Sequence, residues 1–192
     1  MLYWKSDCFW TPEEFPACGN HVALHRIFSS SPLFHRHTAT LKRMADFQSI
    51  AEMMQSCAEH AVQTAHDRFG FELDYSEQSI ESLETILASV SANLNLLENE
   101  QVEEQVKLWG GYLGEVVRRY WNGGWELIQY PGGNAAVPTL LVSGSQLYPL
   151  LKVYRRLTMG EGENVWKFYE QIRNRLATVH PLDGTRDAAD GQ

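Results

Sequence analysis

The chain has 192 residues and a formal net charge of −8, with 44% hydrophobic and 21% charged residues. This composition is typical of a globular protein, and the length suffices for one folded domain with an appendage. The sequence contains no apolar run of the 18 or more residues that a transmembrane helix needs, and no basic-then-apolar leader opens it. We therefore expect a cytoplasmic protein that does not enter a membrane.

The acidic residues are concentrated in one part of the chain. Residues 44–109 carry two Lys/Arg against thirteen Asp/Glu, whereas residues 1–43 carry five against three and residues 110–192 carry nine against eight. An acidic field repels nucleic acid and attracts a basic protein. The sequence thus predicts a protein partner and no nucleic acid, with a merely soluble acidic surface as the alternative.

Residues 1–43 differ from the rest, with three prolines and four of the seven histidines. We expect an N-terminal extension, poorly ordered or upstream of a natural start at Met44; a packed arm is the alternative. A zinc site made by Cys8, Cys18, His21 and His25 is a further alternative. Nine residues separate the two cysteines, however, where compact zinc sites have two to four. We predict no metal and no cofactor, and the odd number of cysteines argues against a disulfide framework.

Two helices are predicted after this segment. The first covers residues 46–69 and ends at Gly70, because apolar residues recur every three or four positions. Cys57 lies on its apolar stripe, which indicates a small buried hydrophobe. His60 and His66 are six residues apart and share no helix face, so they do not form a metal pair. Ser76 is the predicted N-cap of the second helix. Its buried side is predicted to comprise Ile80, Leu83, Leu87 and Val90.

A long central helix is predicted from Glu100 to just before Gly123 and Gly124, which would supply a left-handed stop. Its apolar stripe is predicted to comprise Val102, Val106, Trp109, Leu113, Val116, Val117 and Tyr120.

Three glycines, Gly110, Gly111 and Gly114, lie inside this helix, where each costs about 1 kcal/mol relative to alanine. The missing side chains indicate either close packing of a neighbouring element or a ligand lying over bare backbone. Glu115 is predicted to pair with Arg118 or Arg119, with a binding role as the alternative.

The remaining chain predicts a β-hairpin and two helices. Residues 125–130 and 137–142 flank the turn PGGN, and Pro138 indicates an edge position for the second strand. Ser143–Ser145 is predicted to lead into a helix with Pro149 near its first position, and Lys152, Arg155 and Arg156 are expected to face outward. A last helix follows over residues 165–176. The fold class is thus α+β, mainly helical, with about five helices and a small antiparallel hairpin in one domain at 44–180, and a polar tail at 181–192.

Three stretches together resemble a known family: LDYSEQSIESL at 73–83, GGYLGEVVRRYWNGGW at 110–125 and YPLLKVYRRLTMGEGENVWKFY at 148–169. In this order they are similar to a family of small, functionally uncharacterised bacterial proteins. Its mark is a G-x-Y-x-G-E-V-x-R-R helix followed by a K-V-Y-R-R-L helix. The resemblance covers residues 46–176 and not residues 1–43. It implies no activity. The comparison with immunity and antitoxin proteins rests only on the small size and acidic character that such proteins share with this chain.

The sequence leaves two main hypotheses for the function, and a structural or oligomeric module is a third. The first is a non-catalytic acidic binding protein, such as an immunity or antitoxin protein that blocks a basic toxin. Its contact residues would be Glu98, Glu100, Glu103 and Glu104. The second is a small-ligand or anion-binding protein, or an enzyme, that uses the glycine helix and the 152–156 helix. Its residues would be Gly111, Gly114, Glu115, Arg118, Arg119, Lys152 and Tyr154. Because the chain has no G-x-S-x-G, H-E-x-x-H or phosphate-loop motif, we predict no catalytic residue and favour the first function.

Overall fold

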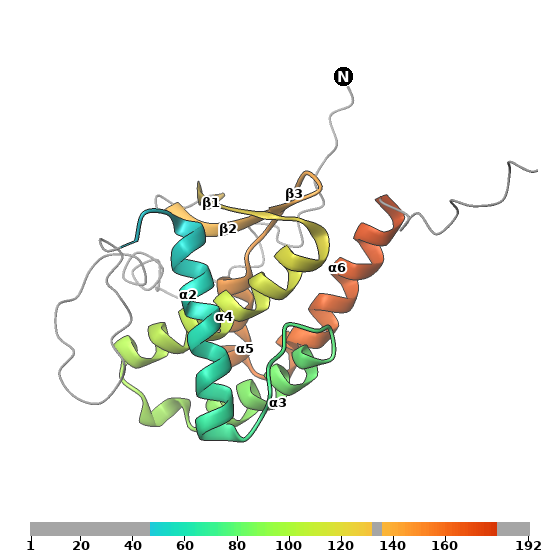
Figure 1. Ribbon diagram of the computed structural model, residues 1–192. Helices are drawn as coiled ribbons and strands as arrows, with labels where there is room; N and C mark the ends of the chain where they lie inside the picture. The colour runs from blue at the N-terminus through green and yellow to red at the C-terminus, as the bar shows by residue number, and fades with distance from the viewer. Residues whose placement is uncertain (1–46, 132–135, 180–192) are drawn as a thin grey trace, which may run out of the picture.

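The computed structural model describes residues 47–131 and 136–179. These residues form five α-helices and one three-stranded antiparallel sheet, which confirms the predicted α+β, mainly helical class (Figure 1). Along these residues, no helix is both long and apolar enough to span a membrane. The predictions for residues 1–43, including the Cys8, Cys18, His21 and His25 set, and for residues 181–192 lie outside the described residues.

The first predicted helix is α2, Ile50–Thr64, continued by a π-helical turn, η3, Ala65–Phe69. It begins four residues later than predicted, because the Ser49 side chain caps it by accepting the Glu52 N–H at 3.1 Å. It ends as predicted at Gly70, whose φ of 70° is left-handed.

The second helix is α3, Ser79–Ala92, and a 3-10 turn, η4, Leu94–Leu96, follows it. The Ser76 hydroxyl accepts the Ser79 N–H at 3.2 Å, as an N-cap does, although the regular helix begins only at Ser79. The predicted buried side is confirmed for Ile80, Leu83, Leu87 and Val90.

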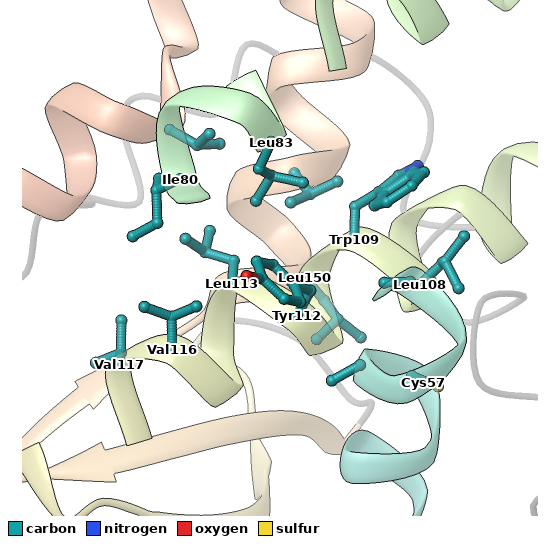
Figure 2. Packing of buried hydrophobic residues seen from close by; sticks show 14 of the residues in the cluster. Cys57, Ile80, Leu83, Leu108, Trp109, Tyr112, Leu113, Val116, Val117 and Leu150 are labelled. Atoms are coloured by element: carbon teal, nitrogen blue, oxygen red, sulfur yellow. The ribbon is translucent and has the colours of Figure 1, made fainter. Parts of the chain in front are cut away.

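The central helix is α4, Asn99–Trp121, and it packs mainly against α2 and α5. Its side chains Trp109, Tyr112 and Leu113 lie among residues of α2, α3 and α5 in the core (Figure 2). Two details of the prediction were wrong. Asn122, with φ 50°, makes the left-handed end in place of the glycines, since asparagine tolerates this conformation. Tyr120 is 52% exposed, because the helix end extends past the core.

The sheet consists of β1, Gly124–Gln129, β2, Ala136–Val142, and β3, Ser145–Leu147, in the order β1-β2-β3. The third strand was missed. Ser143 and Gly144 both have positive φ, 48° and 75°, and make a tight hairpin turn instead of leading into a helix. The edge prediction for β2 was also wrong, because β2 is the middle strand. β3 pairs only with residues 140–142, so the missing N–H of Pro138 breaks no bond to β3.

The chain ends, in its described part, with α5, Pro149–Met159, and α6, Val165–Val179. Pro149 occupies the first position of α5, as predicted. Gly160, with φ 85° and ψ −154°, ends α5 and leads into the short turn η5, Glu161–Glu163. In this arrangement, α5 lies against both α3 and α4 (Figure 1).

Candidate functional site

Neighbouring elements occupy the space that two of the central glycines leave. A Cβ atom at Gly110 would lie 2.8 Å from the Leu150 Cα of α5, and one at Gly111 would lie 2.8 Å from the Cys57 Cβ of α2. Both distances are far inside van der Waals contact. Cys57 is 3% exposed, which confirms it as a buried hydrophobe, and this burial raises the pKa of its thiol to about 11.

Gly114 is covered by an aromatic ring. A Cβ atom there would lie 2.2 Å from Cζ2 and 2.3 Å from Cη2 of the Trp125 indole, which comes from β1. The prediction of close packing over the glycines is therefore confirmed. The glycine positions of the alternative ligand site, Gly111 and Gly114, are filled by protein.

Glu115 is a fully buried carboxylate, with 0% exposure. The Arg118 guanidinium donates to both of its oxygens, at 2.8 and 2.9 Å, and the Trp125 indole N–H donates at 2.8 Å. Arg119 lies farther away, at 3.7 Å. The predicted pairing with Arg118 or Arg119 is confirmed, and it meets the requirement that a buried charge be paired and hydrogen-bonded. Trp125 is a partner that sequence reasoning missed, because it lies on another element.

Arg119 also stacks on an aromatic ring, with its guanidinium carbon 3.4 Å from the centre of the Tyr75 ring. Tyr75 has a left-handed φ of 64°, and its N–H donates to the Tyr112 hydroxyl at 2.9 Å. The Tyr112 hydroxyl in turn shares a 2.6 Å hydrogen bond with Ser79. Burial raises the pKa of Tyr75 and raises that of Tyr112 to about 12, so both phenols stay protonated. This arrangement fixes Arg119 against the α3 side of the molecule.

The expectation that Lys152, Arg155 and Arg156 face outward was wrong. Lys152 is 8% exposed and Arg156 is 2% exposed, while Arg155 and Tyr154 are half-buried. Arg156 comes three residues after the inward-facing Val153, so it falls on the apolar stripe of α5. The helical spacing therefore indicated burial, and the charge of the side chains was the misleading feature.

Each buried cation of α5 has a carboxylate partner on another element. Lys152 donates to Glu163 at 2.7 Å, and Arg155 lies 3.3 Å from the same carboxylate. Arg156 donates to Glu84 of α3 at 2.6 Å. The second Glu84 oxygen accepts the backbone N–H of Val165 at 2.8 Å. Glu84 thereby joins α3 to α5 and to the first residue of α6.

A third network joins the turn that precedes α3 to α6. The Tyr169 hydroxyl donates to Glu77 at 2.5 Å, and Arg173 lies 3.3 Å from the other Glu77 oxygen. Burial and the adjacent carboxylate raise the pKa of Tyr169, which therefore remains a hydrogen-bond donor.

Most of the Lys and Arg side chains in the described residues take part in these ion-pair networks. The described residues contain ten Lys and Arg side chains, and six of them form ion pairs with Glu77, Glu84, Glu115 or Glu163. The six are Arg118, Arg119, Lys152, Arg155, Arg156 and Arg173. The internal pairing of the basic second half leaves the surface richer in carboxylates than in cations.

The predicted acidic contact residues lie at the start of α4. Glu98 caps the helix: its side chain accepts the Gln101 N–H, and the Gln101 side chain accepts the Glu98 N–H at 2.9 Å. Glu100 is exposed in the first turn, and Glu103 and Glu104 are half-buried. Burial raises the pKa of Glu104, although nearby Lys107 and Arg68 oppose the shift. Glu98 thus has a structural role as a cap, and both Glu98 and Glu100 are exposed.

Among the described residues, no group of three or more His, Cys, Asp and Glu side chains is placed to hold a metal ion. No family model, curated protein or solved structure matches the chain. The resemblance to the bacterial family therefore stays a prediction.

Proposed function

We propose that the protein is a non-catalytic binding protein of the immunity or antitoxin type, and that the acidic start of α4 contacts a basic protein partner. The observation that carries this proposal is the internal pairing of six of the ten described cations. Residues 47–109 hold twelve Asp and Glu against two Lys and Arg, so carboxylates dominate the accessible charge in this part.

An acidic surface of this kind acts mainly on the rate of association. Opposite charge on a partner steers the two molecules together before they touch, and the resulting gain in the association rate falls with ionic strength. The start of α4 suits this role because Glu100 is exposed and two further glutamates follow one turn later. We place the protein in the cytoplasm, where a free thiol such as that of Cys57 persists.

The competing hypothesis of a ligand or catalytic site has no comparable support. Its central carboxylate, Glu115, is fully buried and bound by Arg118 and Trp125. Its lysine, Lys152, is bound to Glu163. These side chains are therefore engaged in holding the fold together, and we assign them structural roles.

The experiment begins with capture of a stoichiometric partner from the native host, using the full chain as bait at low salt. Stopped-flow association is then measured at two salt concentrations, because the Debye length falls from about 10 Å at 0.1 M to about 3 Å at 1 M. The association rate constant should drop steeply at high salt. A rate constant that does not change with salt would refute the proposal.

A charge-reversal pair of variants locates the contact. Changing Glu100, Glu103 and Glu104 to lysine should slow association by about tenfold or more, with a smaller effect on dissociation. The matched control reverses Glu81, Glu126 and Glu170, which lie on other elements and change the net charge equally. Equal slowing by both variants would mean that only the overall charge matters and that the start of α4 is not the contact.

A further inference from the structure

The helices α3 and α5 both end beside one surface groove of about 740 Å³. The end of α3 and the turn η4 form one wall, and the end of α5 forms the other. Its lining comprises the apolar residues Ala92, Leu94, Leu157 and Met159, together with Ser91, Asn95, Thr158 and Gly160. The groove is therefore a place where the core approaches the surface.

One large, exposed apolar side chain lines this groove, and a second lies in the turn η4, which contributes Leu94 and Asn95 to the lining. Met159, in its lining, is 55% exposed, and Leu96, in the adjacent turn η4, is 74% exposed. Leu96 is the most exposed of the large hydrophobic side chains in the described residues. Apolar groups gathered in a concave surface are typical of contact sites for another molecule.

The electrostatic surroundings of the groove are negative. The C-terminal end of a helix carries a partial negative charge, and two such ends meet here. The last turn of α3 contains no basic residue, and Arg156, the basic residue in the last turn of α5, is buried against Glu84. Glu161 directly follows the lining residue Gly160, Glu98 comes two residues after Leu96, and both glutamates are exposed.

The groove is held in shape by a direct bond between its walls. The Ser91 hydroxyl of α3 donates to the Leu157 carbonyl of α5 at 2.9 Å. At the end of α5, Gly160 takes φ 85° and ψ −154°, a conformation that favours glycine, and the chain turns away there. A preformed groove loses little entropy when it binds.

We propose that this groove receives an apolar side chain flanked by Lys or Arg, presented by the basic protein partner. The apolar side chain would lie against Met159 and Leu96, and the flanking cations would approach the two helix ends and the Glu98 and Glu161 carboxylates. This inference rests on the proposed function and adds to it a second contact, whose wall at Leu94 and Asn95 lies a few residues before the start of α4. The groove supplies the anchor, and the carboxylates supply the steering.

The test uses the full chain labelled with ¹⁵N and a synthetic 14-residue peptide of leucine and lysine with helical spacing. One control peptide has the same composition in scrambled order, and another has glutamate in place of lysine. The amide signals of residues 91–96 and 157–161 should shift with the first peptide and much less with the controls. Leu96→Ser and Met159→Ser should each weaken peptide binding by about tenfold, whereas Leu127→Ser, at a site that is 50% exposed on β1, should leave it unchanged.

Several results would overturn the inference. These are an absence of shifts at millimolar peptide, shifts spread over the acidic surface and insensitive to both groove variants, and equal binding of the glutamate peptide. Groove signals that move with protein concentration alone would identify a second copy as the occupant and would also overturn it. If the groove fails while partner association remains salt-dependent, only the groove is refuted. If the peptide binds while partner association ignores salt, the proposed function is refuted instead.

Discussion

Replacing Gly114 by alanine tests whether the glycines of α4 exist to admit Trp125. The new Cβ would lie 2.2 Å and 2.3 Å from Cζ2 and Cη2 of the indole, and 3.2 Å from Cγ of Pro149. The indole cannot simply rotate away, because its N–H is bonded to the buried Glu115 at 2.8 Å. Either the ring moves and that bond is lost, or the sheet shifts away from the helix.

The expected cost follows from three terms. Overpacking of a core costs about 1–3 kcal/mol. Loss of a buried hydrogen bond costs about 1–3 kcal/mol. Alanine has a better helix propensity than glycine, which offsets about 1 kcal/mol. We therefore expect Gly114→Ala to lower the free energy of unfolding by about 1–5 kcal/mol.

Urea unfolding followed by far-ultraviolet circular dichroism measures this change without relying on tryptophan fluorescence. The control is Gly162→Ala, because a Cβ atom at Gly162 meets nothing within 4 Å. Its free energy of unfolding should stay within about 0.5 kcal/mol of the wild-type value. A Gly114→Ala protein as stable as the wild type would refute the reasoning.

Making the same substitution in a Trp125→Phe protein tests whether the clash with the indole causes the loss of stability. Trp125→Phe removes the part of the indole that includes Cζ2 and Cη2, so it makes room for the new Cβ. Gly114→Ala should then cost less in the Trp125→Phe background than in the wild type, and a double-mutant cycle measures the difference. Additive effects of the two substitutions would show that the loss of stability has another origin.

Two further predictions concern charged groups. Arg118→Ala should lower the free energy of unfolding toward the lower end of about 3–5 kcal/mol, because Glu115 keeps Trp125 but loses its bidentate partner; an unchanged urea midpoint would contradict this. In an NMR titration His66 should titrate above pH 6.5, because Glu72 accepts a hydrogen bond from it, and His60 below, because it is partly buried near a cation. Since folding raises the pKa of His66, its pairing with Glu72 stabilises the fold at pH values below the unfolded-state pKa. That stabilisation is lost as the pH rises through the folded-state pKa. Equal titration midpoints for the two histidines would refute the assignment.

Much of the helical framework could be predicted because it depends on local spacing. The apolar stripe of α4 and its glycines follow from residues within a few turns, and the structure places that helix at Asn99–Trp121. The requirement for close packing at Gly114 was also predictable, since three interior glycines are costly unless something occupies the space. The identity of the occupant, Trp125, depends on how β1 folds back over the helix, which no local pattern specifies.

The charged groups were harder to place because their partners are distant in the chain. Arg156 pairs with Glu84, 72 residues earlier, and the helical position of Arg156 alone indicates burial without indicating the partner. The strand β3 was missed for a different reason. Three residues are too short for a periodic pattern, and the turn before it depends on Ser143 adopting a positive φ, which is uncommon for serine.

The internal ion pairs also change how the charge asymmetry of the sequence should be understood. Part of the acidic excess in residues 44–109 serves the fold, because Glu77, just before α3, and Glu84 of α3 neutralise Arg173 and Arg156 of the later helices. Those two carboxylates contribute little to the field outside the molecule, since their charge is compensated at short range. Exposed carboxylates outside these four networks, Glu100 in the first turn of α4 among them, contribute more to the field that a partner meets. Net charge alone therefore overstates the reach of the acidic half, because the effective field depends on which carboxylates are exposed and which are paired within the fold.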